Sequence, residues 1–247
     1  DLRTSRGLGD VYKRQFVGDN YSYIFMASLI GGLCLSLNLF GILFSRVIII
    51  DSFPFKFIKN HNYNFSKFKK HLPLILINLS IMCLLFPLGI LMISDWIIVP
   101  YDNLLIFLFQ IIVILIIDDF YFYWFHRLLH KNKFLYKKIH IIHHKASNPF
   151  PADYLYEHPL EWMAGLLGPF IAFLILGEVY FETIVLYLII RVLHELDIHS
   201  GIKSSIYKYF PFAGVNEYHA LHHKYHSNHF ASLFSFWDII FKTHSKY

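Results

Sequence analysis

The chain of 247 residues is 56% hydrophobic and only 16% charged, a balance too apolar for a water-soluble domain of this size. Its formal net charge is +5, but the lysines lie in loops beside long apolar segments, so anionic lipid headgroups and membrane topology explain the charge better than nucleic acid does. The two cysteines, Cys34 and Cys83, both lie in apolar segments, which argues against a disulfide framework and against cysteine metal ligands.

Residues 1–15 are polar and basic, unlike the sequence that follows, and we interpret them as a non-native or disordered tail. Residues 16–247 are predicted to form a single domain. Residues 21–45 and 72–94 contain no charged side chain, and each segment is long enough to cross the apolar core of a bilayer. A third apolar run, residues 103–117, is short alone but continues into the helix that bears His126 and His130.

Lysine and arginine are unevenly distributed between the loops, which predicts how the spans are oriented. The loop of residues 46–71 is basic, whereas residues 95–102 contain neither lysine nor arginine. The first loop is therefore expected in the cytoplasm, and the third span returns the chain to the cytoplasm at Asp118. Residues 162–193 are apolar again but interrupted at Gly177 and Glu178, and they predict either two tilted spans or a re-entrant hairpin. We expect an all-α fold: an integral membrane helical bundle of about four spans with a cytosolic, histidine-rich helical cap.

Histidines at helical spacing form three groups in the second half of the chain. The 16 histidines placed at random would give the pattern H-x-x-H-H about 0.07 times. The chain contains it twice, as HIIHH and HALHH, with H-x-x-x-H upstream of the first copy. A lone histidine is more often a surface or hydrogen-bonded core residue, but clustered imidazoles on one helix face are typical of a metal site. The eight histidines are His126, His130, His140, His143, His144, His219, His222 and His223.

Eight histidines are too many for one tetrahedral metal ion and suit two ions. Imidazole binds zinc, copper, iron and nickel, so the ligand type alone does not choose the metal. Two irons could activate dioxygen, whereas zinc has no redox chemistry.

The phrases YWFHRLLH, HIIHH and HALHH, in this order, resemble the three histidine boxes of the fatty acid hydroxylase/sterol desaturase superfamily. Further phrases are most similar to its C4-methylsterol oxidase branch: YEHPLE, ELDIHSG and FASLFSFWDIIFKT. The resemblance extends from Asp118 to the C-terminus.

The resemblance implies a membrane-bound, non-haem di-iron monooxygenase that oxidises a sterol C4-methyl group stepwise through alcohol and aldehyde to carboxylate. Its cofactors would be two iron ions, which zinc can replace in purified samples. Dioxygen would be the co-substrate, and electrons would come from NAD(P)H through a separate protein such as cytochrome b5. The implied location is the endoplasmic reticulum membrane of a eukaryote or the inner membrane of a bacterium, with the active site facing the cytoplasm.

The resemblance also implies roles for residues beyond the eight histidines. His199 matches the histidine of the family's HSG phrase and is added to the iron ligands. His158 of the HPLE phrase is also added, although a capping or supporting role stays open for it. Glu161 and Asp197 are the preferred hydrogen-bond acceptors for ligating histidines, with helix capping or ion pairing as the alternative. Three further histidines are not assigned as ligands: His194, a supporting or lining residue, and His226 and His229, interpreted as solvated loop residues.

Two alternatives remain open at this point. One is a different reaction within the same superfamily, such as hydroxylation of a fatty-acyl or other lipid, or desaturation of a sterol. The other is a histidine-rich metal transporter, which is less favoured because transporter sites lie near the membrane midplane. The histidines of this chain follow the ends of the predicted spans.

Overall fold

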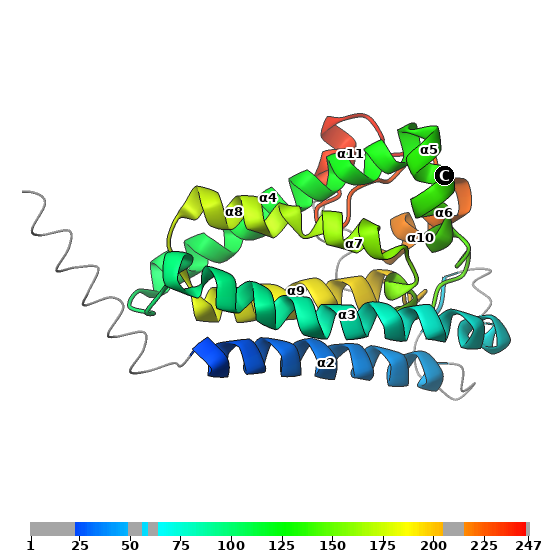
Figure 1. The fold of residues 1–247 in the computed structure, drawn as a ribbon. Coiled ribbons are helices and arrows are strands. Elements are labelled where there is room, and N and C mark those ends of the chain that lie inside the picture. Colours follow the sequence, from blue (N-terminus) through cyan, green and yellow to red (C-terminus); the bar gives the residue numbers. More distant parts are fainter. Residues whose placement is uncertain (1–22, 49–55, 59–63, 205–214, 246–247) are drawn as a thin grey trace, which may run out of the picture.

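The computed structural model describes residues 23–48, 56–58, 64–204 and 215–245, and most of these residues are helical (Figure 1). The tail predicted at residues 1–15 lies outside them. The elements are, in chain order, α2 (Tyr23–Val47), α3 (Phe65–Ile97), β1 (Ile98–Val99), α4 (Leu104–Lys131), α5 (Lys133–Leu135), η1 (Tyr136–His140), α6 (Ile141–His144), η2 (Pro151–Leu155), α7 (Pro159–Gly165), α8 (Leu167–Leu176), β2 (Val179–Tyr180), α9 (Phe181–Ile198), α10 (Asn216–Tyr225) and α11 (Phe236–Ile240).

Within the described residues, four helical segments are long and apolar enough to cross a membrane: α2, α3, α4 and the pair α7–α8. Large apolar side chains such as Leu43, Met92 and Leu174 are exposed on these segments, as contact with lipid requires. The prediction of an all-α, multi-pass membrane bundle is confirmed. The helix α3 begins at Phe65, before the predicted span at 72, because the Asn64 side chain caps it by accepting a hydrogen bond from the Lys67 amide (3.1 Å).

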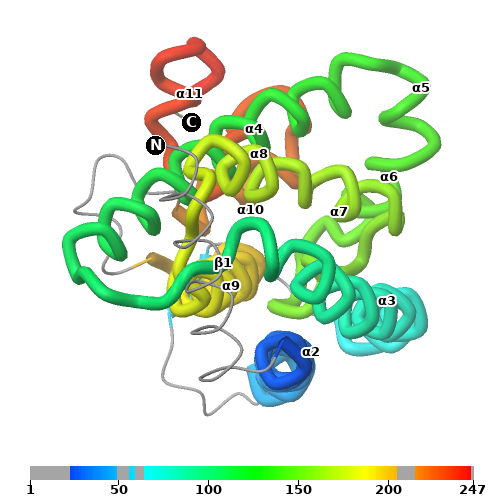
Figure 2. The backbone as a smooth tube through the Cα atoms, turned by 60° about the vertical axis from the view of Figure 1, so that its left-hand side comes forward, coloured from blue at the N-terminus to red at the C-terminus, as the bar shows by residue number. Residues whose placement is uncertain are grey.

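The helices form two layers that lie one against the other (Figures 1 and 2). In one layer α2 packs against α3 and α9, and in the other α4 packs against α8. The short elements α5, α6 and α10 gather at one end of the bundle, beside the C-terminal end of α4 (Figure 1). All the histidine groups therefore lie at the same end of the molecule.

The interrupted apolar region forms a helical hairpin, in which α7 and α8 run out and α9 returns. The chain reverses at Gly177, which has a φ of 72° that favours glycine. Gln110 of α4 holds the turn: its amide donates to the Glu178 carbonyl (3.0 Å) and its oxygen accepts from the Tyr180 amide (3.0 Å) and the Thr183 hydroxyl (2.8 Å). A short parallel pairing of β1 with β2 ties the turn to the end of α3.

Polar side chains of the first two spans bind the irregular segment that connects α6 to α7. Asn78 of α3 donates to the carbonyl oxygens of Leu155 (2.8 Å) and Glu157 (2.9 Å). Ser45 of α2 accepts from the Ala152 amide (3.0 Å). Non-helical backbone packed against apolar helices needs such partners, because lipid offers none. These contacts fix the segment that leads from the histidine box of α6 to α7.

Gly168 allows α8 to approach α4 closely. A Cβ added there would lie 2.4 Å from Oδ1 of Asp118 and 3.2 Å from the backbone oxygen of Asp118. Gly168→Ala is therefore expected to force the two helices apart and to lower the free energy of unfolding by about 1–3 kcal/mol. The measurement is the midpoint of thermal unfolding in detergent.

Gly165→Ala is the matched control, because a Cβ at Gly165 meets no atom within 4 Å. Alanine is the better helix former by about 1 kcal/mol, so this variant should be neutral or slightly more stable. Equal unfolding midpoints for the two variants would contradict the close contact at Gly168.

Candidate metal centre

The polypeptide doubles back after α4 and returns its histidines to those at the end of that helix. His126 and His130 lie one turn apart on α4. Asn132 follows α4, and its side chain starts the next helix by accepting hydrogen bonds from the amides of Phe134 (2.9 Å) and Leu135 (3.1 Å). A π-helical turn, η1, follows and ends at His140, and α6 continues from it. Such turns are rare and occur frequently at functional sites.

Nine of the ten histidines predicted as ligands fall into two clusters, in each of which one ring nitrogen per histidine lies within 4.8 Å of all the others. The first cluster is His126, His130, His140, His144 and His222. The second cluster is His143, His199, His219 and His223.

Each H-x-x-H-H phrase is divided between the two clusters. In the phrase on η1 and α6, His140 and His144 join the first cluster and His143 joins the second. In the phrase on α10 the assignment is reversed: only the middle histidine, His222, joins the first cluster. The spacing of the sequence predicts that His140, His143 and His144 share one face of a helix. That prediction is wrong, because successive residues of a helix point about 100° apart, so the neighbours His143 and His144 point to different clusters.

Three histidines of the first cluster have their Nδ1 atoms engaged by acceptors. Nδ1 of His126 donates to the carbonyl oxygen of Phe230 (2.8 Å), and Nδ1 of His222 donates to the carbonyl oxygen of Asn228 (2.8 Å). Nδ1 of His140 donates to Oε1 of Glu161 (2.6 Å). A neutral imidazole has a single N–H, so in all three rings the Nε2 atom carries a bare lone pair.

The Nε2 atoms of the first cluster lie closer together than neutral imidazoles alone can tolerate. Nε2 of His130 is 2.8 Å from that of His140, 3.1 Å from that of His222 and 3.2 Å from that of His144. A fourth contact, 2.9 Å, joins His144 to His140. Only His130 and His144 have a hydrogen free for these contacts, so at most two of the four can be hydrogen bonds, and the others bring two nitrogens together without one.

A cation removes this conflict. Two nitrogens bound to the same ion at about 2.0–2.1 Å, with an angle of about 90–110° between the bonds, lie about 2.8–3.4 Å apart. The observed separations match this spacing, and a nitrogen-rich donor set suits iron, zinc, copper and nickel. The residues of the first cluster therefore fit a bound metal ion.

The second cluster has the same character and adjoins the first. Nδ1 of His199 donates to the carbonyl oxygen of Glu195 (2.8 Å), which leaves its Nε2 bare, 2.9 Å from Nε2 of His219 and 3.4 Å from Nε2 of His143. Nε2 of His223 lies 3.0 Å from that of His219. The rings of His223 and His144, one from each cluster, have centroids 5.0 Å apart. Two metal ions held here would be close neighbours.

Burial keeps the histidines of α10 neutral. Removal from water, followed by the electrostatic effect of neighbouring histidines, lowers the pKa of His219, His222 and His223 well below the ordinary value. The same causes lower the pKa of His143. Metal ligation requires the neutral form, so these rings are ready to bind a cation at neutral pH.

The remaining predicted ligand, His158, belongs to neither cluster. It precedes α7, and its Nδ1 accepts a hydrogen bond from the Leu160 amide (3.1 Å), so it caps that helix. Asp197, predicted as an acceptor for a ligating histidine, binds Asn216 instead. Its side chain and its carbonyl accept from the side-chain amide of Asn216 (3.2 and 2.8 Å), which ties α9 to the start of α10. Glu161, in contrast, is the acceptor for His140 described above.

The histidines left unassigned by the sequence lie around the clusters. His194 is buried, and its Nε2 atom has no hydrogen-bond partner among the described residues. The ring of His226 packs on His144, with centroids 4.2 Å apart. His229 is only 2% exposed and stacks on Tyr218, so its interpretation as a solvated residue is wrong.

Glu195 is a site residue that the sequence analysis did not select. Besides its carbonyl bond to His199, it forms an ion pair with Arg191 (Nη2 to Oε1, 3.0 Å), and Arg191 in turn pairs with Asp118 (Nε to Oδ2, 3.0 Å). Glu195 lies four residues before His199, one turn away on the same helix. That spacing was the available signal for it, whereas nothing in the sequence connects Arg191 with Asp118.

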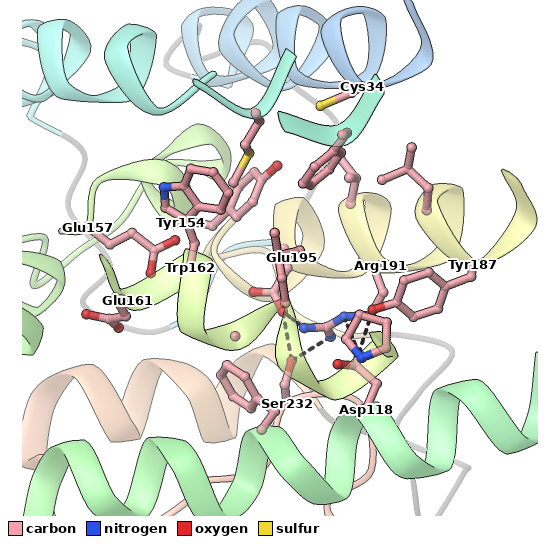
Figure 3. Close-up of a pocket in the computed structure, with 18 of the residues that line it drawn as sticks. Cys34, Asp118, Tyr154, Glu157, Glu161, Trp162, Tyr187, Arg191, Glu195 and Ser232 are labelled. Atoms are coloured by element: carbon pink, nitrogen blue, oxygen red, sulfur yellow. Dashed lines mark hydrogen bonds and ion pairs between the residues drawn. The ribbon is translucent and has the colours of Figure 1, made fainter. Parts of the chain in front are cut away.

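A cavity of about 250 Å³ lies between the membrane helices and extends to both histidine clusters. Its walls are largely apolar and come from α2, α3, α4, α7, α8 and α9, and histidines of both clusters lie at its polar end. Figure 3 shows the other polar side chains of the wall: Arg191 lies between Asp118 and the pair Glu195 and Ser232, and Glu157 and Glu161 lie farther along the cavity. The arrangement can hold an apolar molecule against the two histidine clusters.

Comparison with known proteins identifies relatives over this same region. The family model "Fatty acid hydroxylase" matches residues 111–243, more than half of the chain. The chain is 31% identical over 151 residues to methylsterol monooxygenase erg25B of Aspergillus fumigatus, an alignment covering 59% of this chain and 51% of the relative. It is 35% identical over 147 residues to methylsterol monooxygenase 2-2 of Arabidopsis thaliana, covering 56% and 53%.

A relative with a different name matches equally well. The chain is 32% identical over 157 residues to very-long-chain aldehyde decarbonylase GL1-11 of Oryza sativa, an alignment covering 60% of this chain and 57% of the relative. The chain thus spans about half the length of the curated relatives it matches. No solved structure shows a significant match.

The family model covers both H-x-x-H-H phrases and the H-x-x-x-H phrase, whose histidines form most of the two clusters. The predicted resemblance to the superfamily and to its methylsterol oxidase branch is confirmed by these matches. The chain belongs to the fatty acid hydroxylase family.

Proposed function

We propose that this protein is a membrane-bound monooxygenase with a non-haem di-iron centre, and that it oxidises the C4-methyl group of a sterol. Dioxygen is the co-substrate, and the electrons come from NAD(P)H through a separate protein such as cytochrome b5. The centre faces the cytoplasm, on the endoplasmic reticulum membrane of a eukaryote or the inner membrane of a bacterium, as the basic loops suggest.

One observation carries the proposal: bare Nε2 atoms from separate helices converge at the polar end of an apolar cavity between membrane helices. The nine histidines proposed as ligands are His126, His130, His140, His144 and His222 for one ion and His143, His199, His219 and His223 for the other. Iron bound there would supply the one-electron redox chemistry that activates dioxygen, which zinc cannot do.

The chain's own residues orient the ligands and the substrate. The carboxylate of Glu161 holds the proton of His140 on Nδ1, and the carbonyl of Glu195 does the same for His199, so both Nε2 atoms stay available. The apolar walls of the cavity accept the ring system of a lipid and exclude water, which would otherwise compete for the oxidant. Fixing one C–H bond beside the centre then decides which carbon is oxidised.

The substrate is assigned from the relatives' names. Two of the relatives described above are methylsterol monooxygenases, and both align with the part of this chain that contains the histidine phrases. The rice relative, an aldehyde decarbonylase, supports a second candidate, a reaction on a long-chain aldehyde. Both substrates are apolar molecules with a small polar end, and both suit the cavity described above.

Product analysis separates the candidates. The chain is expressed in a yeast strain that lacks its own methylsterol oxidase, and its membranes are incubated with NADPH and either a 4-methylsterol, a long-chain acyl lipid or a long-chain aldehyde. We expect the C4 alcohol, aldehyde and carboxylate of the sterol, detected by mass spectrometry, and no product from membranes carrying the empty vector. A hydroxylated acyl chain or an alkane as the sole product would reject the sterol assignment.

A further inference from the structure

The segment that follows α10 supplies two of the acceptors that orient the first cluster. It contains the phrase FASLFSFWDIIFKT, to which no role has yet been given. As described above, the carbonyl oxygens of Asn228 and Phe230 accept the Nδ1 protons of His222 and His126. The path of this backbone therefore determines how two of the five rings point.

Two buried carboxylates hold this backbone in place. Asp238 of α11 accepts from the amides of Phe230 (Oδ1, 2.9 Å) and Ala231 (Oδ2, 3.1 Å) and from the hydroxyl of Thr243 (Oδ1, 2.7 Å). Its side chain therefore closes residues 230–243 into a compact loop. Asp238 is 2% exposed.

Asp119 of α4 fastens the same loop to the helix that carries His126. Its Oδ1 accepts from the Leu233 amide (2.8 Å) and its Oδ2 from the Phe234 amide (2.8 Å). Asp119 is 1% exposed and lies two turns before His126 on α4. Each carboxylate thus receives two neighbouring backbone N–H groups, one on each oxygen, an arrangement that a neutral amide side chain cannot reproduce.

We infer that Asp119 and Asp238 are positioning residues for the first metal site, acting through the backbone of residues 228–234 on His126 and His222. The inference rests on the proposed metal-binding function of the clusters. It predicts selectivity, because a ring of the second cluster is oriented by the backbone of α9: His199 directly follows that helix and donates to the Glu195 carbonyl in its last turn. The Ser232 hydroxyl of the C-terminal loop contacts the Glu195 carboxylate (2.9 Å) and not this carbonyl.

The test uses the full chain, purified in detergent, stripped with a chelator and titrated with Co²⁺ without oxygen. The d–d absorption and the cobalt content per chain report binding. The unmodified chain should bind two Co²⁺ ions. Asp119→Asn should weaken one of the two binding steps by about 10–100-fold and leave the other unchanged. The weakened step should be the one that His222→Ala removes, and the retained step the one that His219→Ala removes.

Two further variants make the test decisive. Thr243→Val removes one hydrogen bond to Asp238 and one to the Tyr123 hydroxyl (2.9 Å), but it leaves the backbone contacts of both carboxylates in place. It should therefore weaken the same step to a smaller extent, and it tests the inference even if Asp119→Asn does not fold. Trp237→Phe is the control, because it lies in the same loop on α11 but its Nε1 atom has no partner among the described residues, and it should bind two ions as the unmodified chain does.

The possible failures are distinguishable. An unmodified chain that binds no Co²⁺ overturns the proposed metal function and this inference with it. An unmodified chain that binds two ions, with Asp119→Asn and Thr243→Val both unchanged or both weakened equally at the two steps, overturns the positioning role alone.

Discussion

Replacement of His143 by alanine is expected to abolish turnover and to remove metal from the second cluster, while the protein remains in the membrane. His143 lies on α6, and its Nε2 is 3.4 Å from that of His199. Its ring is 5.8 Å from the rings of both His140 and His144 of the first cluster. The side chain therefore lies where the two clusters meet.

The measurements are metal content per chain and sterol product formed by membranes with equal amounts of protein. His158→Ala is the control. It changes the same residue type near the same cavity, but His158 only caps α7. Its loss should cost about 1 kcal/mol of stability and leave both metal ions bound. Turnover by His143→Ala, or loss of metal from His158→Ala, would contradict the ligand assignment.

Arg191→Met is expected to have the largest effect on stability. The guanidinium pairs with Asp118 and Glu195 and donates to the Ser232 hydroxyl (3.3 Å), all in the wall of the cavity. Removing the cation would leave two buried carboxylates without their partner, and breaking a buried ion pair in this way costs about 3–5 kcal/mol. Glu195 also accepts from His199, so the loss of order should extend to the second cluster.

This loss of stability is measured by thermal unfolding in detergent, in which the fraction of protein that stays monodisperse reports the folded state. Arg191→Lys keeps the charge but not the planar fork that reaches Asp118, Glu195 and Ser232 together. Its unfolding midpoint should fall between those of the unmodified chain and Arg191→Met. Arg127→Met is the control for loss of an arginine: its guanidinium rests on the rings of Tyr123 and Trp124, and its replacement should cost less than about 1 kcal/mol. An unfolding midpoint for Arg191→Met equal to that of Arg127→Met would show that the ion cluster does not stabilise the fold.

The membrane character and the histidines of the candidate metal site could both be predicted from local patterns. The described part of the charge-free stretch 21–45 lies in α2 and the stretch 72–94 lies in α3, because a span needs only a sufficient run of apolar residues. The histidine phrases identified eight of the nine clustered histidines, because their spacing is unusual enough to stand out within a few residues. His199 came from a resemblance in a short phrase rather than from spacing.

The supporting residues were less predictable, because a carboxylate reveals nothing about its partner until the chain is folded. Glu161 was selected and accepts from His140, twenty-one residues before it. Asp197 was selected as well, but Glu195, one half-turn away on α9, is the residue that contacts His199. Asp119 and Asp238 act on backbone amides, and no sequence pattern indicates which amides those are.

By itself, the sequence determined that this protein is a helical membrane protein with imidazoles enough for two metal ions, since composition and spacing are local properties. The tertiary structure alone decided which histidine joins which cluster. Neighbouring residues of a helix diverge by about 100°, so each H-x-x-H-H phrase faces two directions at once. Only the packing of α4, α6, α9 and α10 against one another determines what each direction meets.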